Sequence, residues 1–263
     1  MRAMTATQYE KDLQMLVRDK YEGNAEKVTQ EDKERLAAGE PLAYVIGWIP
    51  FLGLSIDLTS RPLIPRPETE FWTEQLLVRL HEKFGDTADK PFSFLDLCAG
   101  SGAIGLAVLK AFPNAQVSFG ELMPEHVEQI KKNIVLNSLD ASRADVRESY
   151  LFESFRNDIH QEMRFNVIAI NPPYIPGDRE LEASVTNFEP LEALYSGPDG
   201  LELIRDIAIK IDEYLFPKAE VWLEADTSNI ETAAEALMNG GAVKTEILCD
   251  QYDRQRVVVS YYS

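Results

Sequence analysis

The chain has 263 residues, of which 45% are hydrophobic, and its 26 basic and 44 acidic side chains give a formal net charge of −18. This composition supports a sizeable core in one large domain, or in one domain with a small appendage, and it excludes a largely disordered chain. No apolar run approaches the roughly 20 residues that span a bilayer, and the first residues lack the apolar core of a secretory signal. The acidic field repels polyanions. We therefore expect a cytoplasmic protein with no membrane partner, acting on a protein or a small molecule rather than directly on nucleic acid.

Cysteine and histidine usage narrows the chemistry further. The two cysteines, Cys98 and Cys249, cannot form a disulfide framework, which favours a reducing compartment. His81, His126 and His160 are scattered, and no Cys/His group has metal-ligand spacing. We expect no structural metal.

The N-terminal quarter of the chain predicts a small appendage. Residues 1–40 are typical of a short helical region, in which Thr29 offers an N-cap and acidic residues follow it. Residues 41–67 are punctuated by Gly and Pro and predict a β-hairpin linker, with its strands within residues 48–58. The remaining residues, 68–263, form the expected main domain.

From residue 68 onward the pattern alternates helix and strand. The strand 165–170 is a nearly continuous apolar run, as in a parallel strand that is covered on both faces. The last two expected strands, near 246–249 and 256–262, lack the intervening helix of a parallel crossover and should pair as an antiparallel hairpin. The sequence therefore predicts a doubly wound α/β fold, Rossmann-like, with a mostly parallel sheet and an antiparallel C-terminal edge.

A glycine-rich turn follows the expected strand 92–97. Gly100, Gly102 and Gly105 match the G-x-G-x-x-G fingerprint of dinucleotide sites, with Glu121 about twenty residues later. Such glycines let the backbone approach a ligand at a helix N-terminus. Asp96 precedes the turn, where it would repel a pyrophosphate but attract the ammonium group of a methionine moiety. The pattern favours S-adenosylmethionine over NAD, with Glu121 accepting hydrogen bonds from the ribose hydroxyls.

A second motif, Asn171-Pro172-Pro173-Tyr174, stands directly after the buried strand 165–170. Ligands of open α/β sheets bind at this edge. The prolines remove two donors, so the outward groups are the Asn171 side-chain oxygen and backbone carbonyls, which suit a planar –NH2 group. Tyr174 offers a ring on which a flat amide or base stacks. We expect methyl transfer to a planar nitrogen, driven by positioning and exclusion of water rather than by a strong base.

Several longer segments of the chain are more specific than either motif alone. The segments are Gly39-Glu40-Pro41-Leu42-x-Tyr44-x-x-Gly47, Ile64-Pro65-Arg66-Pro67-Glu68-Thr69-Glu70, Asp96-Leu97-Cys98-Ala99-Gly100-Ser101-Gly102-Ala103-Ile104, Asn171-Pro172-Pro173-Tyr174-Ile175 and Phe188-Glu189-Pro190. Together they resemble the HemK/PrmC family of release factor glutamine methyltransferases, over most of the chain from about Gly39 to Tyr261.

The resemblance implies a class I methyltransferase fold and methylation of the glutamine in the Gly-Gly-Gln motif of peptide-chain release factors. S-adenosylmethionine would be the cofactor and S-adenosylhomocysteine the product. The expected catalytic residues are Asn171, Pro172, Pro173 and Tyr174. The expected cofactor-binding residues are Asp96, Cys98, Ala99, Gly100, Gly102, Glu121, Leu151 and Asn171. The segment 64–70 should lie near the mouth of the site, with no individual roles assigned.

The chain departs from the family pattern at two places. Tyr150 stands where an Asp usually precedes a Leu-Phe or Trp-Phe pair, so that Tyr150 or backbone groups would have to contact the adenine. The N-terminal helical region is also shorter than the usual docking domain of the family.

Three alternatives remain open. An amino-group methyltransferase acting on adenine or guanine in DNA or RNA would share both motifs, although no Lys/Arg cluster supports it. An NAD-dependent oxidoreductase would leave Asp96 and the segment 171–174 unexplained. A binding protein without activity would have no need to keep both motifs intact.

Overall fold

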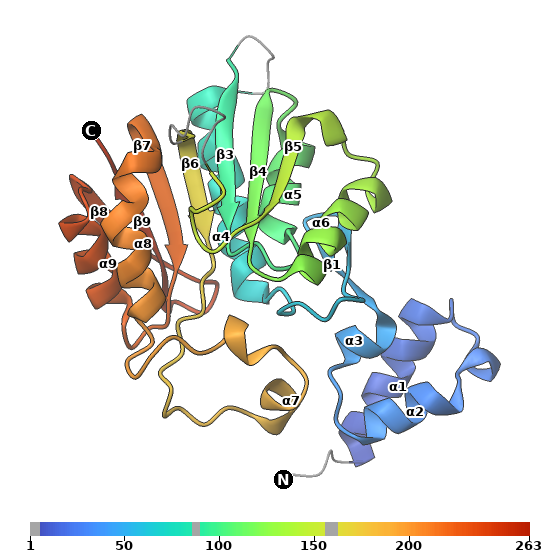
Figure 1. Cartoon of the computed structure of the whole chain (residues 1–263). Coiled ribbons are helices and arrows are strands. Elements are labelled where there is room, and N and C mark those ends of the chain that lie inside the picture. Colours follow the sequence, from blue (N-terminus) through green and yellow to red (C-terminus); the bar gives the residue numbers. More distant parts are fainter. Residues whose placement is uncertain (1–5, 86–89, 156–162) are drawn as a thin grey trace.

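The computed structural model describes residues 6–85, 90–155 and 163–263 (Figure 1). Its centre is a seven-stranded sheet with the strand order β5-β4-β3-β6-β7-β9-β8. The five strands β5, β4, β3, β6 and β7 run parallel to one another, whereas β9 is antiparallel to both β7 and β8. This confirms the predicted doubly wound fold and its antiparallel C-terminal edge. The strands are β3 (Phe92–Leu97), β4 (Ala115–Glu121), β5 (Ala144–Glu148), β6 (Phe165–Ile170), β7 (Leu215–Glu224), β8 (Lys244–Cys249) and β9 (Gln255–Tyr261).

Helices cover both faces of the sheet because successive strand residues point to opposite sides. In β3, Phe94 packs in a cluster with α4, α5 and α6, whereas Leu95 packs in a second cluster with α8 and α9. Both side chains are fully buried, as the apolar runs of parallel strands predict. The longer helices are α4 (Pro67–Phe84), α5 (Ala103–Ala111), α6 (Pro124–Leu136), α8 (Glu202–Lys210) and α9 (Ile230–Asn239). Shorter helical turns are η2 (Ala141–Arg143), α7 (Ala183–Thr186), η3 (Leu191–Ala193) and η4 (Ile211–Tyr214).

The N-terminal helices form a unit that projects from the sheet (Figure 1). Its small core consists of Leu16, Leu36 and Val45. The unit includes a five-residue helix that the sequence did not predict, because a single turn after Pro41 leaves no periodic pattern. Its elements are α1 (Ala6–Lys20), η1 (Ala25–Lys27), α2 (Gln30–Ala37) and α3 (Leu42–Ile46).

The expected hairpin is present as β1 (Trp48–Phe51) and β2 (Leu54–Asp57). It packs on the main domain through α6. Asn137 exchanges two side-chain hydrogen bonds with the Ser55 backbone, and Asn133 accepts one from the Asp57 amide. The hairpin therefore belongs to the same packed body as the sheet.

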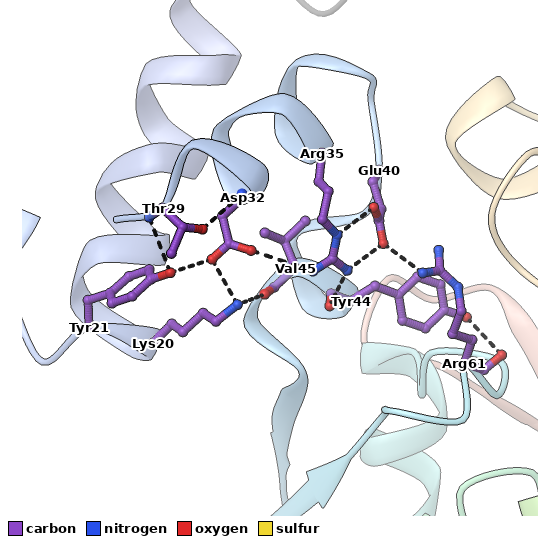
Figure 2. Close-up of polar contacts among 9 residues, drawn as sticks. All are labelled: Lys20, Tyr21, Thr29, Asp32, Arg35, Glu40, Tyr44, Val45 and Arg61. Atoms are coloured by element: carbon purple, nitrogen blue, oxygen red, sulfur yellow. Dashed lines mark hydrogen bonds and ion pairs between the residues drawn. The ribbon is translucent and has the colours of Figure 1, made fainter. Parts of the chain in front are cut away.

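A chain of ion pairs fastens the helical unit to the segment after the hairpin (Figure 2). Glu40 is buried, accepts a bidentate hydrogen bond from Arg35 and forms an ion pair with Arg61. The Tyr44 hydroxyl donates to the Pro62 carbonyl at 2.6 Å, and the Arg61 guanidinium lies over the Tyr44 ring. Glu40 and Tyr44 of the segment 39–47 thus hold the chain that leads into residues 64–70. Among the described residues, no helix is long and apolar enough to cross a membrane.

Candidate active site

A pocket lies at the carboxyl ends of four neighbouring strands, β5, β4, β3 and β6, where ligands of open parallel sheets bind. The turn after β3, the end of β4 and the turn after β5 form one side of the pocket. The segments before α4 and around η3 form the other side. The lining includes Leu63, Pro65, Thr69, Cys98, Ala99, Gly100, Ser101, Glu121, Leu122, Met123, His126, Ser149, Tyr150, Leu151, Asn171, Pro173, Pro190, Glu192 and Ala193.

The turn after β3 has the conformation that its glycines permit. Gly100 and Gly102 have φ of 54° and 80°, and Cys98 shares this left-handed region at 59°. A non-glycine residue in this region is strained, and Cys98 holds that conformation beside the pocket. Burial raises the pKa of the Cys98 thiol, so Cys98 is a small wall residue and not a thiolate nucleophile.

Glu121 fixes the turn against the end of β4. Its Oε2 accepts the Gly100 amide at 2.7 Å, and its Oε1 accepts the Met123 amide at 2.9 Å. Each carboxylate oxygen has further lone pairs, and the side chain lines the pocket. Glu121 can therefore accept hydroxyl donors from a bound ligand.

Asp96 lies behind the turn with 1% of its surface exposed. Its Oδ2 accepts the Gly105 amide at 2.8 Å, whereas its Oδ1 has no partner. Burial raises the pKa of Asp96 to about 8, the Gly105 hydrogen bond opposes that rise, and the charge of Glu121 adds to it. A buried carboxylate with a free oxygen is unfavourable unless a cation or a proton compensates it, so the residue fits a ligand that brings positive charge.

Asn171 follows β6 and lines the pocket. Its Nδ2 donates to Thr69 Oγ1 at 3.3 Å, and its Oδ1 is buried with no partner. Pro173 lines the pocket beside it, whereas Pro172 is buried. Asn171 therefore carries an acceptor without a partner at a position that lines the pocket.

The sequence and the fold of this chain are similar to those of known proteins. The family model of the methyltransferase small domain matches residues 72–188. The chain is 32% identical to the release factor glutamine methyltransferase of Thermodesulfovibrio yellowstonii, covering 86% of this chain and 78% of that relative. It is 32% identical to the enzyme of the same name from Deinococcus radiodurans, covering 89% and 79%.

The chain belongs to the release factor glutamine methyltransferases. The predicted family and its methyltransferase fold are confirmed. The fold is also that of the T. thermophilus 16S rRNA N2 G1207 methyltransferase in complex with AdoMet and guanosine, with a TM-score of 0.51 and 18% identity over 82% of this chain and 50% of that one. At that identity the likeness concerns the fold alone.

Two family motifs far apart in the sequence of this release factor glutamine methyltransferase bind each other beside the pocket. Arg66 donates to the buried Glu189 at 2.7 Å, and the Ile64 amide donates to the other Glu189 oxygen. Glu70 accepts the Leu52 amide at the tip of the hairpin. The sequence singled out both motifs but could not pair them.

Tyr174, an expected catalytic residue, is placed differently from its neighbours in this methyltransferase. It is not among the described residues that line the pocket, and its hydroxyl donates to Glu224 Oε1 at 2.9 Å. This hydrogen bond fixes the Tyr174 side chain on Glu224, and the expected stacking of its ring on a substrate stays a prediction. Glu224 itself was missed, because an acidic residue at the end of an apolar strand carries no local signal of its partners.

The turn after β5 contributes Tyr150 and Leu151 to the lining of the pocket. Tyr150 is 44% exposed, and the backbone below it is held by Ser149, whose hydroxyl donates to the Leu151 carbonyl. The methyltransferase thus has a partly exposed aromatic ring at this position of the pocket. In the part of the chain that the structure describes, no group of three His, Cys, Asp or Glu residues could hold a metal ion.

Proposed function

We propose that this protein transfers a methyl group from S-adenosylmethionine to the side-chain amide nitrogen of the glutamine in the Gly-Gly-Gln motif of peptide-chain release factors. The observation that carries the proposal is the unpaired Asn171 Oδ1 in the pocket of a chain that belongs to this enzyme family. A planar –NH2 group needs acceptors in its plane, and this oxygen is such an acceptor.

The residues around the pocket fit the expected cofactor. Asp96, with its unpaired buried oxygen, would compensate the ammonium group of the methionine moiety. Glu121 would accept the ribose hydroxyls, and Tyr150 with Leu151 would contact the adenine. Cys98, Ala99, Gly100 and Gly102 shape the turn around which the cofactor would lie. When bound, the cofactor supplies an electrophilic methyl group on sulfur and leaves as S-adenosylhomocysteine.

The protein's own part in the reaction is positioning. Asn171 Oδ1 would accept one hydrogen of the glutamine –NH2 and the Pro172 carbonyl the other, which fixes the plane of the nitrogen. As the nitrogen gains the methyl carbon it becomes cationic, and both hydrogen bonds strengthen. The nitrogen then loses one proton, which passes to solvent once the methylated glutamine leaves the pocket. The apolar walls around Pro173 and Leu63 exclude water from the pocket.

We propose a division of the chain into three parts. Residues 1–40 would be a helical region for docking the release factor, residues 41–67 a hairpin linker, and residues 68–263 the catalytic domain. The separate small core of the N-terminal helices supports this division, and the packing of α3 on α1 and α2 extends the helical region past residue 40. A substrate from the translation machinery would place the reaction in the cytoplasm.

Mass spectrometry of a release factor incubated with the protein and S-adenosylmethionine tests the proposal, with DNA as a parallel substrate. We expect one added methyl group on the glutamine of Gly-Gly-Gln. Asn171→Ala should abolish transfer while cofactor affinity, measured by calorimetry, stays nearly unchanged. Label in the nucleic acid and none in the release factor would overturn the substrate assignment in favour of an amino-group methyltransferase of DNA.

A further inference from the structure

A buried carboxylate lies directly behind the pocket and is not part of its wall. Glu224, at the end of β7, has 1% of its surface exposed and accepts three side-chain hydrogen bonds. Its Oε2 accepts Thr69 Oγ1 and Trp72 Nε1, each at 2.7 Å. Its Oε1 accepts the Tyr174 hydroxyl at 2.9 Å. The donors come from α4 and from the segment after β6, so Glu224 joins three parts of the fold.

This cluster continues into the pocket through Thr69. The Thr69 hydroxyl has one hydrogen, which it donates to Glu224, and its oxygen accepts Asn171 Nδ2 at 3.3 Å. Asn171 therefore presents its nitrogen to Thr69. Its Oδ1, which has no partner, must then face away from Thr69.

The donor and acceptor roles in this series of hydrogen bonds, from Trp72 through Glu224 and Thr69 to Asn171, are fixed by the groups that take part. An indole N–H only donates, so the Glu224 oxygen beside Trp72 has to accept. When Thr69 gives its single hydrogen to the same oxygen, it can only accept from Asn171. If the Asn171 amide turned over, two acceptors would face each other at Thr69, and the Asn171 –NH2 would replace the acceptor that the substrate nitrogen needs.

We propose that Glu224 and Thr69 are positioning residues, which hold the Asn171 amide so that its oxygen is the acceptor for the substrate –NH2 group. The inference rests on the proposed function for the identity of that group. Thr69 and Glu224 act through Asn171, by fixing which of its two amide atoms meets the substrate. The role also accounts for Thr69 in the segment 64–70, to which the sequence assigned no chemistry.

The chain offers a matched control on the same helix. Thr73 lies one turn after Thr69 in α4, is equally buried, and donates its hydroxyl to the Thr69 carbonyl rather than to the site. Thr69→Val and Thr73→Val therefore remove the same atoms from neighbouring buried positions. Thr69→Ser keeps the hydroxyl and serves as the rescue variant. Glu224→Gln should also be mild, because Trp72 forces the Gln oxygen toward Thr69 and leaves the Gln –NH2 for the Tyr174 oxygen.

The first measurement is independent of the reaction. In spectra of ¹⁵N-labelled protein, the side-chain –NH2 signal of Asn171 is identified by its loss in Asn171→Ala. We expect Thr69→Val to shift this signal and to speed its exchange with water, and we expect Thr69→Ser, Glu224→Gln and Thr73→Val to leave it near the wild-type position. An unchanged Asn171 signal in Thr69→Val would overturn the proposal.

The second measurement is the rate of methyl transfer to the release factor. Loss of an orienting hydrogen bond should lower kcat of Thr69→Val by roughly tenfold or more, with cofactor Kd unchanged. Thr69→Ser and Thr73→Val should stay within about threefold of wild type, which is within the spread of such effects. An equal loss of kcat in Thr69→Val and Thr73→Val would reduce Thr69 to a packing role and overturn the inference. If wild type methylates no release factor, the proposed function fails, and the Asn171 signal still decides the positioning role.

Discussion

Asp96→Asn should make the ligand-free protein more stable near neutral pH while weakening its cofactor site. The Asp96 carboxylate is buried, and one of its oxygens has no partner. Burial raises its pKa to about 8 in the folded chain, against about 3.9 in an unfolded chain. An Asn side chain keeps the acceptor for the Gly105 amide and carries no charge, so the substitution removes the cost of ionising a buried group.

The sign and size of the effect follow from proton binding. Between about pH 4 and pH 8 the folded protein holds a proton on Asp96 that the unfolded chain has released, so stability falls as the pH rises. The contribution is fully present below about pH 4 and is lost progressively up to about pH 8. Each pH unit inside this window costs about 1.4 kcal/mol. From about pH 5.5 to about pH 7.5, wild type should therefore lose on the order of 2.5 kcal/mol relative to Asp96→Asn.

Urea unfolding at these two pH values measures the difference directly. Asp199→Asn is the control: the hydrogen bond from Arg205 lowers the pKa of Asp199, so this group titrates below the window and should give the same offset at both pH values. Calorimetry with S-adenosylhomocysteine should show weaker binding to Asp96→Asn, because its ammonium group loses a counter-charge. Parallel stability profiles for wild type and Asp96→Asn would refute the buried-charge reasoning.

Two further predictions concern packing and the N-terminal unit. Gly105→Ala should destabilise the fold by roughly 1–3 kcal/mol, because a Cβ there would lie 2.3 Å from the Phe119 ring. Thermal unfolding measures the loss, and adding Phe119→Leu to the Gly105→Ala variant should recover part of it. A melting curve like that of wild type would contradict the prediction. Glu40→Gln should cost about 1 kcal/mol, because Arg35 and Arg61 both lose the charge of a buried partner. Urea unfolding tests this with the exposed Glu34→Gln as control, and equal effects of the two changes would dismiss the role of Glu40.

The sequence patterns did not predict the strand β5 or the helix α3, and each omission has a physical reason. β5 carries the polar sequence Ala-Asp-Val-Arg-Glu and lies at the sheet edge, where its side chains are only partly buried. Hydrophobic periodicity reports burial, so an edge strand gives a weak signal. The five-residue helix α3 is little more than one turn, so the helical pattern has no room to repeat. The bond of the Tyr174 hydroxyl to Glu224 joins positions 50 residues apart, so no local pattern in the sequence announces it.

The sequence by itself determined the parallel core, the glycine turn after β3 and the position of Asn171 after β6. These features depend on local patterns, since a buried strand has to be apolar and a tight turn beside a helix N-terminus needs glycine. The tertiary structure alone decided which side chains meet. Thr69 and Glu224 are 155 positions apart in the sequence, and Arg66 and Glu189 are 123 apart. The Thr69–Glu224 contact forms because β7 pairs with β6 and because α4 packs on the sheet through Trp72, which stacks on Trp222 of β7, and the orientation of the Asn171 amide depends on that contact.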